Sequence, residues 1–203
     1  MARDLETTRI RREPHIWLLI EVIFVSTMVV GAVAVARHSS GPWMGRAIPW
    51  ILIAGALTPT LVRGRGLDEL GLRRGRLTQD AMLLCAIVLC VLGFGAAAKG
   101  VIGSLWGPSA LDIHVQEGQW IWWLFFQVTY VALPEELFFR GYLVSAGMRL
   151  LGQNLAAKGC AAQYGVMVLS ALLFSVCHVV SFGTSIFLLT FFPGLLFAWG
   201  YVR

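Results

Sequence analysis

Charged residues are scarce in this sequence. They make up 13% of its 203 residues, whereas apolar residues make up 58% and the mean hydropathy is +0.75. Soluble domains carry about 25% charged and about 45–50% apolar residues, so this composition excludes an ordinary soluble domain. A helix that spans a bilayer needs about 20 mostly apolar residues, and the chain has room for about six such helices.

We therefore predict an all-α, polytopic membrane protein with about six transmembrane helices. The predicted spans cover residues 16–36, 43–62, 81–98, 120–143, 164–181 and 185–202. Residues 1–15 form a cytoplasmic lead in this prediction, residues 16–66 the first two helices, and residues 67–203 a catalytic helical core. The first span is expected to be retained, because its apolar stretch is longer than the roughly 7–15 residues of a signal peptide.

Acidic residues are scarcer than basic ones, which leaves a net charge of +5. The positions of the basic residues explain this excess without nucleic acid. With the N-terminus inside, most of them fall in inner segments, as the positive-inside rule predicts. We expect membrane lipid as a partner, no nucleic acid, and a location in the bacterial cytoplasmic membrane.

Three charged residues nevertheless lie inside the fourth predicted span: Glu135, Glu136 and Arg140. A charge at the bilayer centre costs about 2.5–3.5 kcal/mol on insertion scales, so such residues are rare and usually functional. Glu136 and Arg140 share a helix face and can pair. Glu135 is rotated by about 100° and stays free for chemistry. Taken alone, the Glu136–Arg140 pair is more often structural.

The chain has only four histidines, and His178 lies within the fifth predicted span. Phe174 precedes it by one helical turn, so the aromatic ring can pack against the imidazole. A histidine and a carboxylate that share a water form a general-base system. Taken alone, His178 is more often a hydrogen-bonded core residue. Because a catalytic zinc site usually has three protein ligands, a metal ion stays an alternative that we do not favour, and we expect no cofactor.

These residues form motifs that occur in a fixed order. Glu-Glu-x-x-x-Arg, then Phe-x-x-x-His, then a Phe-x-x-Gly helix at residues 191–194 resemble the CPBP family, the CAAX-protease and bacteriocin-processing membrane proteases. The Gly-Leu-Arg-Arg segment at residues 71–74 resembles a further family segment. The resemblance covers about residues 67–203.

The resemblance implies a glutamate-dependent intramembrane peptidase without a metal. By resemblance, Glu135 would be the base on the catalytic water, His178 would share that water, and Glu136 with Arg140 would brace the site. The implied substrates are membrane-associated peptide or protein precursors, such as prenylated CAAX tails, bacteriocin precursors or proteins with C-terminal sorting tags.

One family motif is missing. The sequence up to Arg203 lacks the later His-x-x-x-Asn motif, which in the family is thought to form the oxyanion hole. Losing one such donor can cost about 10²–10³ in rate. We expect a fragment of a longer protein rather than a catalytically impaired one.

Depth in the membrane sets a further condition. If the fourth span begins at Trp120, Glu135 lies toward its inner end, whereas His178 lies toward the outer end of the fifth span. For the two to meet, the fourth span must be shifted, tilted or broken at Pro134.

The favoured prediction is thus an intramembrane endopeptidase. One alternative is a non-catalytic immunity or scaffold protein that binds a peptide in the same cavity. A less favoured alternative is a proton-coupled transporter, in which the same ionisable groups carry protons. A transporter usually shows related halves with broken helices in matching positions, and the sequence shows none.

Overall fold

The computed structural model describes residues 15–38, 42–71, 86, 89–90, 93–97, 99–101, 103–104, 118–152 and 155–203. This part of the chain is helical and contains no strand, which confirms the all-α prediction. Its α-helices are α1 (His15–His38), α2 (Pro42–Val62), α4 (Trp120–Phe126), α5 (Leu133–Glu136), α6 (Ser145–Leu151), α7 (Leu155–Phe182) and α8 (Phe191–Val202). The described part also contains the 3₁₀ helices η1 (Leu67–Leu70) and η5 (Ser185–Thr190), the π-helical segments η3 (Gln127–Ala132) and η4 (Leu137–Val144), and short helical stretches between residues 86 and 104.

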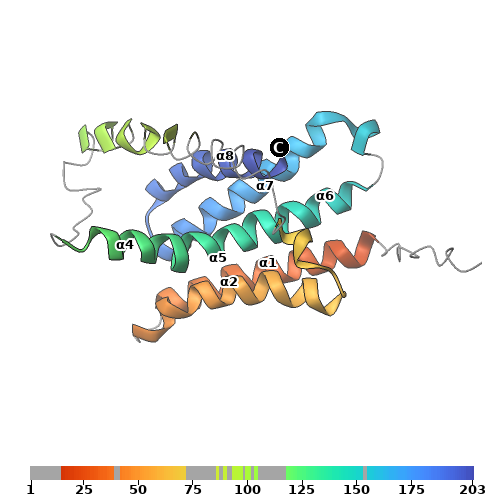
Figure 1. The fold of residues 1–203 in the computed structure, drawn as a ribbon, viewed down its shortest axis with the longest axis horizontal. Coiled ribbons are helices and arrows are strands. Elements are labelled where there is room, and N and C mark those ends of the chain that lie inside the picture. Colours follow the sequence, from red (N-terminus) through yellow and green to blue (C-terminus); the bar gives the residue numbers. More distant parts are fainter. Residues whose placement is uncertain are drawn as a thin grey trace, which may run out of the picture.

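A continuous helical run from α4 to α6 lies in the middle of the molecule. Figure 1 shows it between the α1–α2 pair on one side and α7 with α8 on the other. The largest buried core lies where these layers meet and includes Val29 of α1, Ala56 of α2, Phe138 and Tyr142 of η4, and Phe174 of α7. The central run is therefore held from both sides.

Three helices in the described part are long and apolar enough to cross a membrane: Ile16–His38, Cys160–Phe182 and Ser185–Val202. They coincide with the first, fifth and sixth predicted spans. The second predicted span falls on α2, whose apolar stretch Arg46–Val62 is shorter. The third, at 81–98, falls largely outside the described residues, as does the 1–15 lead, so six spans stay a prediction.

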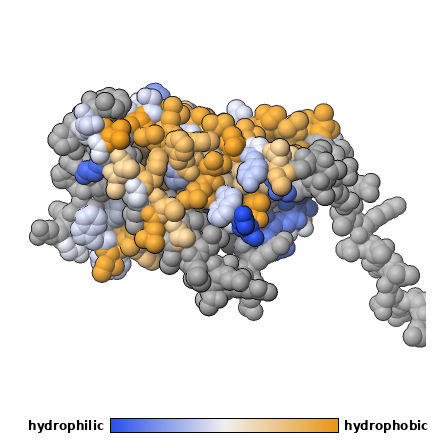
Figure 2. Space-filling model, turned by 90° about the horizontal axis from the view of Figure 1, so that it is seen from above, coloured by the Kyte–Doolittle hydropathy of each residue, from blue (hydrophilic) through white to orange (hydrophobic). Residues whose placement is uncertain are grey.

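The outer surface of these helices is apolar. Large hydrophobic side chains are exposed along α1 and α4, among them Ile23, Phe24, Ile121 and Trp122. Figure 2 shows apolar residues over much of the face in view. Such large exposed patches mark a membrane or protein contact in a folded protein. Together with the long apolar helices they support a membrane protein.

The central run passes through Pro134 without ending. Proline lacks the N–H that an α-helix needs at this position. The π-helical turn of η3 directly before it, closed by the Leu133 N–H on the Val128 carbonyl, is the kind of local adjustment that accommodates an intramembrane proline. The run continues to Leu151, beyond the predicted end at residue 143, so that Glu135 lies near its midpoint. This shift of the run relative to its predicted bounds is one of the three ways in which Glu135 and His178 were expected to meet.

The N-terminal helices are bound to the central run by polar contacts. Tyr142 of η4 donates a hydrogen bond to Glu21 of α1 at 3.1 Å, and Glu21 also pairs with Arg63, which follows α2. At the nearby end of the bundle, Gly141 packs so closely on η1 that a Cβ atom there would lie 2.9 Å from the Leu70 carbonyl oxygen. These contacts fix the position of η4 and thus of the residues before it.

Candidate active site

Glu135 and His178 face each other across the boundary between α5 and α7. Oε1 of Glu135 lies 3.9 Å from Nε2 of His178, and the two side chains are 21% and 19% exposed. The helices are antiparallel, and the hydroxyl of Ser170 on α7 donates to the Phe139 carbonyl at 2.8 Å, which sets their register. Glu135 precedes Phe139 and His178 follows Ser170, so both residues lie on the same side of this contact, where their side chains meet.

The imidazole of His178 has a defined orientation. Its Nδ1 lies 3.0 Å from the carbonyl oxygen of Phe174. Because a carbonyl only accepts, Nδ1 carries the proton in this contact, and in the neutral ring Nε2 presents its lone pair toward Glu135. The Phe174 ring lies 4.3 Å from the imidazole centre, so the contact predicted from their spacing is present.

The separation of the two groups suits a shared water. At 3.9 Å, Glu135 and His178 are too far apart for a direct hydrogen bond. Polar groups at such a distance are commonly bridged by a water, which here would contact both at about 2.8 Å. Both groups would then accept a hydrogen bond from that water, the arrangement that general-base activation needs.

Glu136 points away from this gap and pairs with Arg140, as its spacing predicts. Its Oε1 lies 3.2 Å from Nη1 of Arg140, whose side chain is only 2% exposed. Nη2 of the same guanidinium donates to the carbonyl oxygen of Gly194 on α8 at 3.2 Å. Arg140 therefore joins the carboxylate helix to α8.

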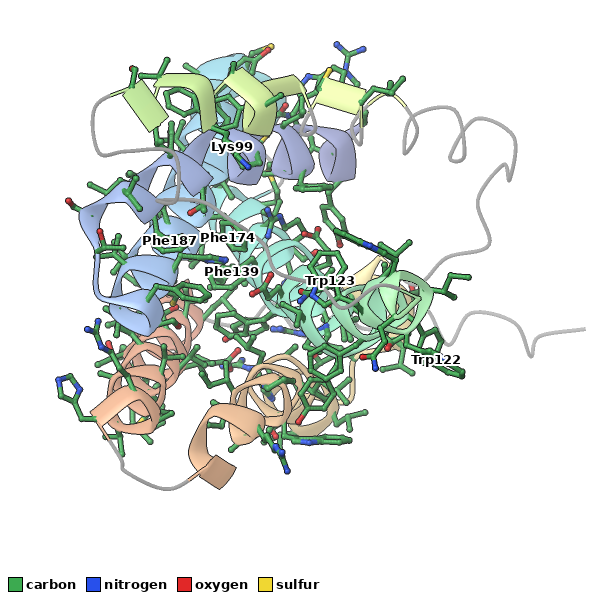
Figure 3. All side chains as sticks on the ribbon, turned by 90° about the vertical axis from the view of Figure 1, so that its left-hand side faces the viewer. Lys99, Trp122, Trp123, Phe139, Phe174 and Phe187 are labelled. Atoms are coloured by element: carbon green, nitrogen blue, oxygen red, sulfur yellow. The ribbon has the colours of Figure 1, made fainter. Side chains whose placement is uncertain are left out.

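Aromatic rings surround the guanidinium of Arg140. Its Cζ lies 4.6 Å from the ring centre of Phe174, 5.4 Å from Phe197 and 6.0 Å from Phe139. Figure 3 shows Phe139, Phe174 and Phe187 close together between the helices. Cation–π contacts of this kind are worth about 2 kcal/mol or more where water is excluded. Phe174 touches both Arg140 and His178 and so connects the two halves of the site.

The glycine of the Phe-x-x-Gly segment has a packing role. A Cβ atom on Gly194 would lie 3.0 Å from Cδ1 of Phe174 and 3.5 Å from the Cα of Ala171. A Cβ atom here would require the Phe174 ring to move by a few tenths of an ångström, so glycine favours this close approach of α8 to α7. The approach places the Gly194 carbonyl within reach of Arg140.

Among the described residues, the donor set at this gap falls short of the ligands that a catalytic zinc site takes. Such a site takes three protein ligands from His, Glu or Cys. Glu135 and His178 face the gap, but the third candidate, Glu136, is turned to Arg140. Within the part of the chain that the structure describes, no group of three or more His, Cys, Asp or Glu side chains is placed to hold a metal ion.

Two parts of the site were not foreseen from sequence. Phe197 and the Gly194 carbonyl both bind Arg140, although the sequence connects neither with it. Phe182 and Phe187 stack on each other at 4.3 Å and lie 6.0 and 6.4 Å from the His178 ring. Phe182 follows His178 by one helical turn, a spacing that could have indicated this contact, whereas Phe187 reaches the imidazole only because the chain turns between α7 and η5.

Residues 117–203 match the family model of the type II CAAX prenyl endopeptidases, Rce1-like. This segment is a little under half of the chain and contains Glu135, Glu136, Arg140, Phe174 and His178. The match agrees with the family that the motifs resemble and points to a protease. It does not extend to residues 67–116, which the motif resemblance included. No curated protein and no solved structure matches the chain.

Proposed function

We propose that this protein is an intramembrane endopeptidase that hydrolyses a peptide bond of a membrane-associated peptide or protein precursor with a water activated by Glu135 and His178. The observation that carries the proposal is the 3.9 Å approach of the two groups inside an apolar helical bundle. The family match supports the hydrolase class, since it covers both residues.

The reaction follows from the arrangement of these groups. Glu135 takes a proton from the shared water while the oxygen of that water attacks the scissile carbonyl carbon. His178 accepts the second hydrogen bond of that water and thereby orients it. When the carbon–nitrogen bond breaks, the proton held by the carboxyl group passes to the leaving amine. Positioned acid–base groups of this kind contribute about 10²–10⁴-fold to rate.

Glu136 and Arg140 have a supporting role in this proposal. Their ion pair keeps the second carboxylate occupied, so that only Glu135 is free to act on water. The Arg140 guanidinium also packs against the Phe174 ring, and the imidazole of His178 packs against the same ring. The remaining proposed features are the 67–203 core, a multi-pass topology with the N-terminus inside, and a mechanism without a cofactor.

Two substitutions test the proposal in reconstituted vesicles with a prenylated CAAX peptide and a membrane-anchored protein precursor. Glu135→Gln and His178→Ala should each lower cleavage by at least about 10²-fold while membrane insertion is unchanged. His38→Ala is the matched control, because His38 is exposed at the end of α1. Full cleavage by either site variant would refute the assignment. Binding of the precursor without cleavage by the unmodified protein would favour the scaffold.

A further inference from the structure

The last turn of α7, which follows His178, is held by two hydrogen bonds. The last carbonyls of any helix have no partner within the helix and need one from elsewhere. Here the Val179 carbonyl accepts from the backbone N–H of Gly183 at 2.7 Å. The Val180 carbonyl accepts from Nη1 of Arg37 at 3.1 Å. One partner is local, and the other comes from α1.

Arg37 lies in the last turn of α1, next to the end of α7. α1 packs against α7, and the hydrogen bond of Arg37 to the Val180 carbonyl shows that their C-terminal ends lie next to each other. Both ends carry the partial negative charge of a helix C-terminus. A guanidinium between them interacts favourably with both helix ends, and this attraction stabilises the observed position of Arg37.

The chain turns sharply at the same point. Gly183 has φ 74°, a left-handed conformation that residues with a side chain rarely adopt. The guanidinium of Arg37 occupies the space that a Cβ atom on Gly183 would need. The turn and the cation thus fit each other. Beyond the turn, Phe187 folds back to stack on Phe182, and both rings flank His178.

We propose that Arg37 is a positioning residue for His178. By binding the Val180 carbonyl it holds the last turn of α7 and the Gly183 turn, and through them the direction in which the imidazole meets Glu135. The inference rests on the proposed function for its catalytic meaning. It adds that α1, which lies outside the segment matched by the family model, is part of the working site.

A first experiment measures the geometry without any substrate. Hydrogen exchange of the full chain in lipid nanodiscs should show faster exchange at the Gly183 amide and the adjoining turn in Arg37→Ala, by about tenfold, since a hydrogen bond from a charged donor is lost. His38→Ala is the control, because His38 contacts the Ala34 carbonyl of its own helix. Unchanged exchange in Arg37→Ala would overturn the proposal.

A second experiment measures cleavage. Arg37→Ala should lower kcat about tenfold with KM unchanged, because small misplacements of a catalytic group slow the chemical step. Arg37→Lys keeps a cationic donor and should recover most of the rate. A merely structural role would instead lower the amount of folded protein at constant kcat, and that outcome would contradict the proposal.

Gly183→Ala supplies an independent variant at the same turn. If Arg37 and Gly183 act through one turn, the effects of Arg37→Ala and Gly183→Ala on kcat should be less than additive in the double variant. Strict additivity would refute the link. If the unmodified protein cleaves nothing, the proposed function fails, whereas the exchange experiment still decides the role of Arg37.

Discussion

The guanidinium carbon of Arg140 lies 4.6 Å from the ring centre of Phe174. The same ring lies 4.3 Å from the imidazole of His178, and the Phe174 carbonyl accepts from that imidazole. A structural ion pair and a candidate catalytic residue thereby both contact one residue, Phe174. The sequence separates these roles into two motifs, but the structure joins them at Phe174.

This double contact predicts different outcomes for two phenylalanines. Phe174→Leu removes the ring from both Arg140 and His178, so cleavage should fall about tenfold or more as the imidazole loses its support. Phe197→Leu removes only a ring 5.4 Å from Arg140 and should leave most of the rate. Initial rates and thermal unfolding in detergent measure the two effects. Equal loss of rate in both variants would show that the link through Phe174 is unimportant.

Removing one partner of the Glu136–Arg140 ion pair should destabilise the protein more than replacing both residues by uncharged ones. Glu136→Gln leaves the guanidinium of Arg140, 2% exposed, without the carboxylate that faces it. Because Glu136 itself is 38% exposed, losing its charge should cost about 1–3 kcal/mol, the penalty of a buried donor left unsatisfied, whereas apolar replacement of both residues is often close to neutral.

The double variant Glu136→Gln/Arg140→Met should therefore be more stable than Glu136→Gln alone. A double-mutant cycle in mixed-micelle unfolding should give a coupling of about 0.5–3 kcal/mol. Zero coupling would mean that the pair contributes nothing to the fold.

Much of this fold could be predicted from sequence, because membrane spans depend on length and apolar composition alone. The contacts of Glu136 with Arg140 and of Phe174 with His178 follow from helical spacing. The approach of Glu135 to His178 did not follow, since it depends on the extension of the central run to Leu151 and on its register against α7. Sequence spacing fixes neighbours within a helix but not the level at which two helices meet.

Contacts between segments that are distant in the chain could likewise not be predicted from the sequence. Arg37 reaches Val180, and Tyr142 reaches Glu21, across large separations in the chain. A cation at the end of an apolar helix is a weak signal, because many such residues only contact headgroups. Nothing in the pattern around Arg37 indicates the carbonyl of another helix.

Removal of metal ions should leave cleavage intact. In the proposed mechanism the water is activated by Glu135 and His178, and the third potential ligand, Glu136, is held by Arg140. We expect the same initial rate before and after dialysis against excess EDTA. Loss of activity in EDTA that is restored by Zn²⁺ but not by Mg²⁺ would contradict the mechanism and require a metal at this site.

Two glycines that differ in surroundings test the close packing of α8. A Cβ atom on Gly194 would lie 3.0 Å from Phe174, so Gly194→Ala must push α8 or the ring aside and draw the carbonyl away from Arg140. Overpacking of this kind costs about 1–3 kcal/mol. Gly165 of α7 is exposed, and a Cβ atom added there would meet nothing within 4 Å, so Gly165→Ala should instead stabilise its helix by up to about 1 kcal/mol.

Comparing these two variants separates the effect of local packing at Gly194 from the general effect of placing alanine in a helix. Gly194→Ala should lower both the unfolding temperature and the cleavage rate, because the position of Arg140 and hence of Phe174 changes. Gly165→Ala should raise or preserve the unfolding temperature and leave the cleavage rate unchanged. A Gly194→Ala protein as stable and active as the unmodified one would show that Arg140 does not need its contact with α8, and the bracing role of the ion pair would then be limited to Glu136.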